Sequence, residues 1–86
     1  MNFDNLSNLI KSKVLVNENI DFVKVEDKSF LHKNHTSNQE GKFHIKLTIQ
    51  SKELKNMNKV ESNKLIFKLL KDEIKDQIHS LQIFFV

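Results

Sequence analysis

The four histidines are the side chains of this sequence that are best suited to bind a metal ion. His32 and His35 stand close together, His44 follows them, and His79 lies near the C-terminal end. The sequence contains no cysteine, which excludes disulfides, cysteine nucleophiles and cysteine-type zinc fingers. Because a structural zinc site takes four ligands, two histidines cannot complete one. Any metal bound by such a pair needs further ligands from a partner or a small molecule.

Each histidine also has an interpretation without metal chemistry. His79 follows a predicted helix, whose C-terminal dipole favours a basic side chain. It also shares strand parity with apolar residues such as Leu81, so a partly buried, hydrogen-bonded side chain is the structural alternative. His44 falls on the polar face of a predicted strand, where it can approach the same site or simply be solvated. We expect His35 to be a solvated loop residue, and for His32 both interpretations stay open.

The basic residues are all lysines, and the net charge of +3 is small. Lys64, Lys68, Lys71 and Lys75 form a stripe on a predicted helix, which could contact phosphates but is also typical of a solvated helix face. With one glycine in the chain, the Gly-x-x-Gly loop of KH domains cannot form. Tryptophan and tyrosine, which stack on bases, are absent. Weak nucleic-acid binding therefore remains as the alternative function.

No known catalytic arrangement is recognisable. Asp27, Ser29 and His32 have the residue types of a hydrolase triad, but three residues in one short segment rarely reach triad geometry. A Gly-x-Ser-x-Gly elbow, a P-loop and a dinucleotide-binding fingerprint are all absent from the sequence. Ser29 is better explained as a residue that bonds to the backbone of a turn. We therefore predict a protein that is not an enzyme.

The elements that position these residues follow from the apolar periodicity. Phe43, Ile45, Leu47 and Ile49 alternate with polar residues and give the clearest strand. The full prediction is a helix over 3–16, a strand over 20–27, a loop over 28–42, a strand over 43–50, a helical turn over 51–57, a helix over 58–76 and a strand over 78–86. This α-β-β-α-α-β order predicts one α+β domain over 1–86, with a three-stranded mixed sheet and helices packed on one face.

Neither a membrane-spanning segment nor a targeting segment is recognisable in the sequence. The longest uninterrupted apolar run, 83–86, is far shorter than the roughly 20 residues that a membrane-spanning helix needs. The N-terminal residues lack the basic leader of a secretory signal and the arginines of a transit peptide. We therefore expect no membrane partner and no targeting segment, with the cytoplasm as the default location and the nucleus also open.

Three segments together resemble the BolA-like protein family: "VKVEDKSFLH", "FHIKLTIQS" and "VESNKLIFKLLKDEIKDQIHSLQI". The resemblance covers about residues 6–86, and its order and spacing are more specific than any single piece. The positions that correspond to the family pattern are Asp27, Ser29, His32, His44, Ile45, Ser51, Leu69, Glu73, Ile78, His79, Ser80 and Leu81. At two of them the residue differs, because the family has an aromatic residue after the histidine of the second strand, here Ile45, and ends Ile-His-Ala-Leu, with Ser80 here in place of alanine. The chain departs from the family where Phe-x-Gly and Arg-His-Arg are usual, with Leu54-Lys55-Asn56 and Ser62-Asn63-Lys64 in their place.

The resemblance implies a fold related to the type II KH domain and a role in iron–sulfur chemistry. BolA-like proteins pair with monothiol glutaredoxins that carry Cys-Gly-Phe-Ser, and the pair can share a 2Fe–2S cluster with glutathione. Carried over, the ligands are His79 and His32, with His44 and His35 as alternates to His32. The implied function is cluster assembly, cluster transfer or iron homeostasis. The isolated chain is expected to be a monomer that binds no cluster, and transcriptional regulation is the alternative.

Overall fold

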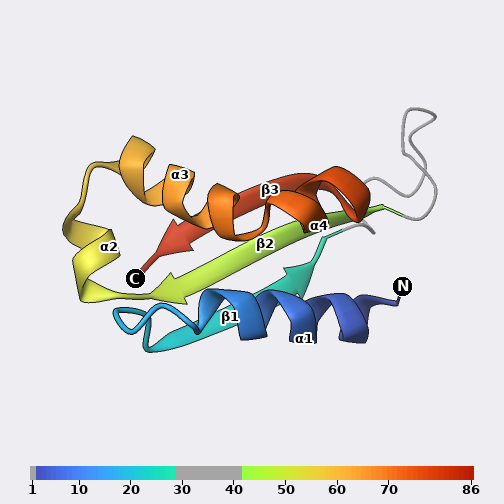
Figure 1. The fold of residues 1–86 in the computed structure, drawn as a ribbon, viewed down its shortest axis with the longest axis horizontal. Coiled ribbons are helices and arrows are strands. Elements are labelled where there is room, and N and C mark those ends of the chain that lie inside the picture. The colour runs from blue at the N-terminus through green and yellow to red at the C-terminus, as the bar shows by residue number, and fades with distance from the viewer. Residues whose placement is uncertain (1, 29–41) are drawn as a thin grey trace.

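The computed structural model describes residues 2–28 and 42–86. Figure 1 shows the order of the elements along this part of the chain. They are α1 (Phe3–Val14), β1 (Phe22–Asp27), β2 (Phe43–Gln50), α2 (Lys52–Asn56), α3 (Lys59–Leu69), α4 (Lys71–Asp76) and β3 (Ile78–Phe85). The order agrees with the prediction, except that the helix expected over 58–76 is divided in two. Most of the loop predicted over 28–42 lies outside the described residues.

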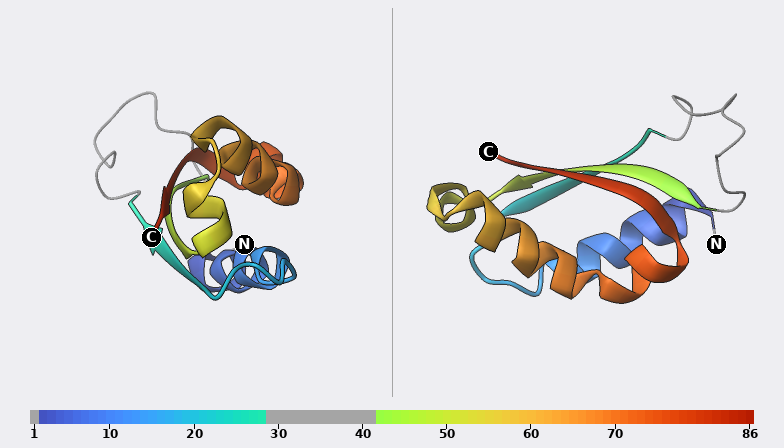
Figure 2. Two further views of the ribbon diagram at one scale, coloured as in Figure 1. Left: turned by 90° about the vertical axis from the view of Figure 1, so that its left-hand side faces the viewer. Right: turned by 90° about the horizontal axis from the view of Figure 1, so that it is seen from above.

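The three strands form a mixed sheet in the order β1-β2-β3. β1 pairs with β2 antiparallel, and β2 pairs with β3 parallel because the intervening helices return the chain to the starting end of the sheet. The right-hand view of Figure 2 shows all the helices on one side of this sheet. The predicted α+β class, the mixed sheet and the one-sided helical layer are confirmed.

The core lies between the sheet and the helices. Alternation along β2 sends Ile45, Leu47 and Ile49 towards the helices, where all three are buried. The intervening residues Lys46 and Thr48 therefore lie on the opposite face, which no helix covers (Figure 2). The helices meet the sheet with Leu6, Ile10 and Val14 of α1 and with Ile66 and Leu70 at the other side of the layer.

The prediction of a single helix over 58–76 is wrong, because the helix is interrupted at Leu70. Leu70 leaves helical geometry with φ −106° and ψ 19°, which ends α3 and begins α4. This segment contains neither proline nor glycine, so the break does not follow from those residues. Leu70 is fully buried at the break. The Asn58 side chain accepts a hydrogen bond from the Val60 N–H at 2.8 Å, which confirms that α3 begins where predicted.

A buried serine joins α3 to α2 at the positions where the chain departs from the usual family pattern. The Ser62 hydroxyl is fully buried and donates to the Leu54 carbonyl at 2.7 Å. The Ser51 hydroxyl in turn accepts from the Leu54 N–H at 3.1 Å and caps α2. These two hydrogen bonds fix the short helix against the longer one.

An ion pair joins the two sides of the helical layer. The Lys13 ammonium of α1 donates to both carboxylate oxygens of Glu73 in α4, at 2.8 Å and 2.7 Å. The Glu73 side chain is only 6% exposed, whereas that of Lys13 is 32% exposed.

Within residues 2–28 and 42–86, none of the helices has the length and apolar character needed to cross a membrane.

Candidate functional site

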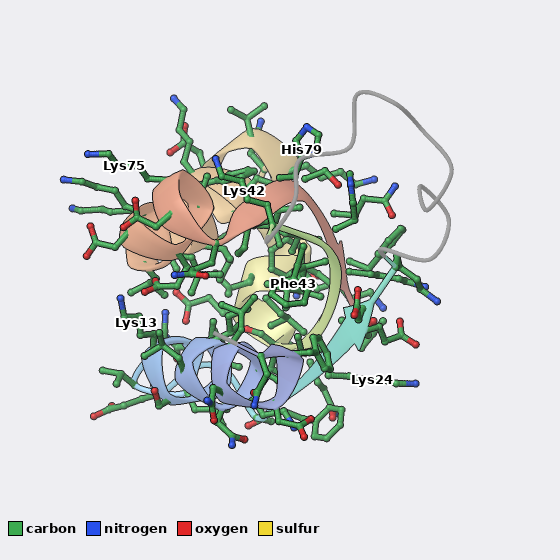
Figure 3. All side chains as sticks on the ribbon, turned by 90° about the vertical axis from the view of Figure 1, so that its right-hand side faces the viewer. Lys13, Lys24, Lys42, Phe43, Lys75 and His79 are labelled. Carbon is green, nitrogen blue, oxygen red and sulfur yellow. The ribbon has the colours of Figure 1, made fainter. Side chains whose placement is uncertain are left out.

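His79 stands at an irregularity in the pairing of β2 with β3. Phe43 pairs with Ile78 and His44 pairs with Ser80, so His79 is an extra residue in β3. A β-bulge of this kind bends a strand and re-aims its side chains. Ile78 is buried, whereas His79 and Ser80 are both exposed. The structural alternative for His79, a partly buried side chain in phase with Leu81, is therefore wrong, and Figure 3 shows the ring projecting outward.

His44 lies directly beside His79. The centroids of the two imidazole rings are 4.7 Å apart, and the ring planes are inclined by 50°. The bulge produces this contact, because it places two residues of β3 opposite the single residue His44 of β2. His44 is only 5% exposed. The alternative of a solvated His44 is thus wrong, although its strand face is one that no helix covers.

Ser80 holds the His44 ring in place. The distance between His44 Nδ1 and Ser80 Oγ is 2.7 Å. A metal-binding histidine usually uses its second ring nitrogen for a hydrogen bond of this kind, which fixes the orientation of the ring. When Nδ1 donates this bond to Ser80, the basic nitrogen of neutral His44 is Nε2. The arrangement therefore suits one exposed imidazole, His79, beside one oriented imidazole, His44.

Ser80→Ala is expected to loosen the His44 ring. Loss of the hydroxyl leaves Nδ1 of a buried imidazole without its 2.7 Å partner, which costs about 1 kcal/mol in the free energy of unfolding. Urea unfolding measures this loss, and long-range ¹⁵N NMR of the imidazole should show a mixture of tautomers. Ser12→Ala, at an exposed helical serine, should cause no such loss. Unchanged stability together with an unchanged His44 tautomer would contradict this role.

The other two predicted histidines lie outside the described residues. The predictions for His32 and His35 therefore stay predictions. Among residues 2–28 and 42–86, no group of three or more histidine, cysteine, aspartate or glutamate side chains could hold a metal ion. The described part of the chain thus offers two neighbouring imidazoles and no third ligand.

Comparison with known proteins shows the family. The model of the family described as BolA-like protein matches residues 16–86. This chain belongs to the BolA-like family. A relative named DNA-binding transcriptional regulator BolA, from Haemophilus influenzae, is 31% identical over 78 residues, which is 91% of this chain and 73% of the relative. The resemblance inferred from the sequence is confirmed.

Solved structures of BolA domains agree with the fold. The BolA domain of SufE1 from Arabidopsis thaliana has a TM-score of 0.75 and 29% identity, covering 93% of this chain and 88% of that one. BolA1 from the same organism has a TM-score of 0.72 and 25% identity, covering 92% and 87% respectively. Both similarities extend over the sheet and the helical layer, so the BolA fold holds for the chain as described.

The lysine stripe of this BolA-like chain is exposed but divided. Lys64 and Lys68 belong to α3, whereas Lys71 and Lys75 belong to α4, beyond the break at Leu70. The sequence predicted that all four lysines lie on one continuous helix. The structure instead divides them between α3 and α4. The Glu61 carboxylate lies 4.0 Å from the Lys64 ammonium, which offsets part of the positive charge.

A carboxylate lies among lysines on the uncovered face of the sheet. The Glu26 carboxylate is 3.4 Å from the Lys24 ammonium and 3.8 Å from that of Lys46. Partial burial raises the pKa of Glu26, but the hydrogen bond from Lys24 and the charges of Lys24, Lys28 and Lys46 together outweigh it. The pKa of Glu26 is therefore lower than the usual value for a glutamate.

Glu26→Gln is expected to reduce the acid sensitivity of folding. A group whose pKa is lower in the folded state stabilises the fold above its unfolded-state pKa, and this contribution is lost as the pH falls through the folded-state pKa. The variant should be less stable than wild type at neutral pH, and the difference should shrink as the pH falls below 4.5, the ordinary glutamate value. Urea unfolding across this range measures it, with Glu18→Gln at an exposed position as control. A pH-independent difference would contradict the assignment.

Two features of the site were missed by the sequence reasoning. The bulge at His79 was not predicted, because no glycine or other local signal marks it. Ser80 stands where the BolA pattern has alanine, so the departure itself was a signal that this position has a role. The contact between His44 and His79 could have been inferred, since both begin neighbouring parallel strands.

Proposed function

We propose that this BolA-like chain pairs with a monothiol Cys-Gly-Phe-Ser glutaredoxin and shares a 2Fe–2S cluster with it and with glutathione. The observation that carries the proposal is the contact between His79 and His44, with 4.7 Å between ring centroids. Histidine can replace cysteine on one iron of such a cluster, and two histidines do so in Rieske centres. The chain then supplies His79 and His44, and the partner and glutathione supply the thiolates.

The donor set of this chain fits a shared cluster better than a metal site of its own. The chain has no thiol, and the described residues bring no third ligand to the two imidazoles. His79 is exposed and can reach a partner, while His44 is held by Ser80. When bound, the cluster supplies iron and sulfide as cargo for transfer. The chain itself acts as an adaptor in cluster assembly, cluster transfer or iron homeostasis, and it has no catalytic role.

Titration of the protein into a glutaredoxin loaded with 2Fe–2S and glutathione tests this function. Visible circular dichroism reports the ligands of the cluster, because imidazole and thiolate give different charge-transfer bands. The spectrum should change to a new, saturable form at one chain per glutaredoxin. Binding without a spectral change would mean that the partner is recognised but the cluster is not shared, and an absence of binding would contradict the proposal entirely.

Nucleic-acid binding is the second candidate, because the relative from Haemophilus influenzae is named a DNA-binding transcriptional regulator. The exposed lysine stripe is the corresponding surface in this chain. Contacts from four lysines to phosphates predict that the logarithm of the binding constant falls with the logarithm of salt concentration at a slope of about −3.6.

Replacement of all four stripe lysines by glutamine is expected to weaken DNA binding without affecting the cluster titration. The four residues are Lys64, Lys68, Lys71 and Lys75. Binding of a labelled DNA duplex, measured by fluorescence anisotropy at several salt concentrations, should weaken and lose most of its salt dependence, because the lysines supply the phosphate contacts. The cluster spectrum should be unchanged, since lysines are not among the proposed cluster ligands. DNA binding with an unaltered slope would show that the stripe is not the surface used.

A further inference from the structure

The outer edge of β3 is open for pairing with another strand. β3 is the last strand in the order β1-β2-β3, so its outer side has no neighbour in the sheet of described residues. The strand Ile78–Phe85 contains no lysine, carboxylate, proline or glycine. Natural proteins usually block edge strands with charges, prolines or bulges. Here the bulge lies at the His79 end, and the other half of the strand lacks such a device.

The backbone of this half presents hydrogen-bonding groups to the outside. The Val86 N–H donates to the Ile49 carbonyl at 2.9 Å, and the Val86 carbonyl accepts from the Ser51 N–H at 3.3 Å. Both groups of Val86 therefore face β2. Because the backbone groups of alternate residues point to opposite sides of a parallel strand, those of Ile83 and Phe85 point to the open edge. An extended chain lying along this edge can pair with them.

A groove of 390 Å³ runs beside the same half of β3. Its walls come from β3 on one side and from α2 and α3 on the other. The lining residues are Leu54, Lys55, Lys59, Asn63, Ile83, Phe84 and Phe85. Leu54 is buried and gives an apolar base, whereas Lys55 and Lys59 are exposed. Neither lysine forms an ion pair with any residue in the described ranges.

We propose that this groove binds an extended acidic peptide, which adds to β3 as a fourth strand. Main-chain hydrogen bonds to Ile83 and Phe85 would supply affinity, and alternate side chains of the peptide would enter the groove. A carboxylate on one of these side chains complements Lys55 and Lys59, with its methylene groups over the apolar base. We name this site the β3 groove.

Charge favours a peptide over a second copy of the chain as the occupant. β3 of a second copy would bring no carboxylate to Lys55 and Lys59, because Ile78–Phe85 contains none. A nucleic acid would satisfy the lysines but could not continue the ladder of main-chain hydrogen bonds. The β3 residues of the groove, Ile83, Phe84 and Phe85, stand at the C-terminal end of β3, whereas the bulge at His79 is at its N-terminal end, so the inference does not depend on cluster sharing.

Binding of a designed peptide to the intact chain tests the inference. The probe is a fluorescein-labelled, N-acetylated peptide of about six residues, a usual strand length, with alternating valine and glutamate. Fluorescence anisotropy should show saturable binding at low salt, and ¹⁵N NMR should show the largest amide changes at Leu81, Ile83 and Phe85. Amide changes confined to other parts of the molecule would overturn the proposal.

Matched variants separate the β3 groove from general attraction between charges. Lys55→Gln/Lys59→Gln should weaken binding roughly five- to tenfold, as expected for two exposed charge contacts. Lys11→Gln/Lys24→Gln removes the same charge from α1 and β1 and should change affinity by less than about twofold, since screening reduces distant effects. Equal losses from the two double variants would show attraction to net charge alone and would overturn the proposal.

A second probe tests strand addition without changing the protein. N-methylation of alternate peptide bonds on the pairing side should weaken binding roughly tenfold, the effect of losing two hydrogen bonds. Equal affinity of the methylated peptide would overturn strand addition. Sedimentation of the free chain and competition with oligothymidylate complete the test. A dimer of the free chain that protects the same amides would show that a second copy occupies this edge. Displacement of the peptide by oligothymidylate would show that nucleic acid does. Either result would overturn the proposal.

Discussion

Replacing His79 by alanine is expected to abolish the change that this chain causes in the circular-dichroism spectrum of a glutaredoxin-bound 2Fe–2S cluster. His79 is the exposed member of the imidazole pair, so a partner can reach it first. The chain has no thiol that could replace the lost ligand. Loss of hydrogen-bonding groups behind a ligand commonly costs 10–100-fold in metal affinity, so loss of a ligand itself should cost more than about 100-fold.

Controls for this variant distinguish ligation from folding. An exposed residue on a bulge contributes little to packing, so His79→Ala should unfold within about 0.5 kcal/mol of wild type. His35→Ala, at the histidine expected to be solvated, should leave the spectral titration unchanged. His44→Ala should also abolish the new spectrum if the pair acts together. A normal spectral change with the His79 variant would show that His79 is not a ligand.

Replacing Lys13 by methionine is expected to destabilise the fold by about 2–3 kcal/mol. The variant leaves the Glu73 carboxylate, whose side chain is 6% exposed, without the ammonium that contacts both of its oxygens. Removing one partner of a fully buried ion pair costs about 3–5 kcal/mol. The smaller value expected here reflects the Lys13 side chain, which is 32% exposed and leaves solvent near the pair.

A double variant provides the sharper half of this test. Lys13→Met/Glu73→Met replaces both charges with apolar side chains of similar length and should recover most of the lost stability, because the unpaired charge is gone. Urea unfolding followed by far-ultraviolet circular dichroism gives the midpoints, which should move without a change in slope. Lys11→Met, at an exposed position of the same helix, is the control. A Lys13 variant within about 0.5 kcal/mol of wild type would contradict the role assigned to the pair.

The sequence was sufficient for the fold because its strongest patterns coincide with the core. The alternation of Ile45, Leu47 and Ile49 fixed β2 and its buried face, and the helical spacing of Leu6, Ile10 and Val14 fixed α1. The break at Leu70 could not be predicted, since no helix-breaking residue marks it and tertiary contacts override a weak local preference. Two apolar residues of α3, Val60 and Phe67, are 60% and 40% exposed, so apolar character alone does not mark the buried face of this helix.

The candidate site was only partly predictable, because its geometry depends on the register of two strands. The alternation of side chains along β3 alone predicts that His79 is partly buried on the same face as Leu81. One extra residue in the pairing of β3 with β2 leaves His79 exposed instead. The same register shift sets His44 and Ser80 opposite each other. Neither relation is visible in a single segment, since 36 residues separate the two members of the hydrogen bond.

Nitrogen hyperfine couplings from the reduced shared cluster test the central claim most directly. The chain is labelled with ¹⁵N-histidine, the glutaredoxin and glutathione are left unlabelled, and pulsed electron paramagnetic resonance records the couplings. We expect two ¹⁵N couplings from the wild-type chain, loss of the couplings in His79→Ala and in His44→Ala because the shared cluster no longer forms, and both couplings in His32→Ala. A cluster without ¹⁵N coupling, or one that loses a coupling in His32→Ala and none in His44→Ala, would contradict the assignment of the imidazole pair.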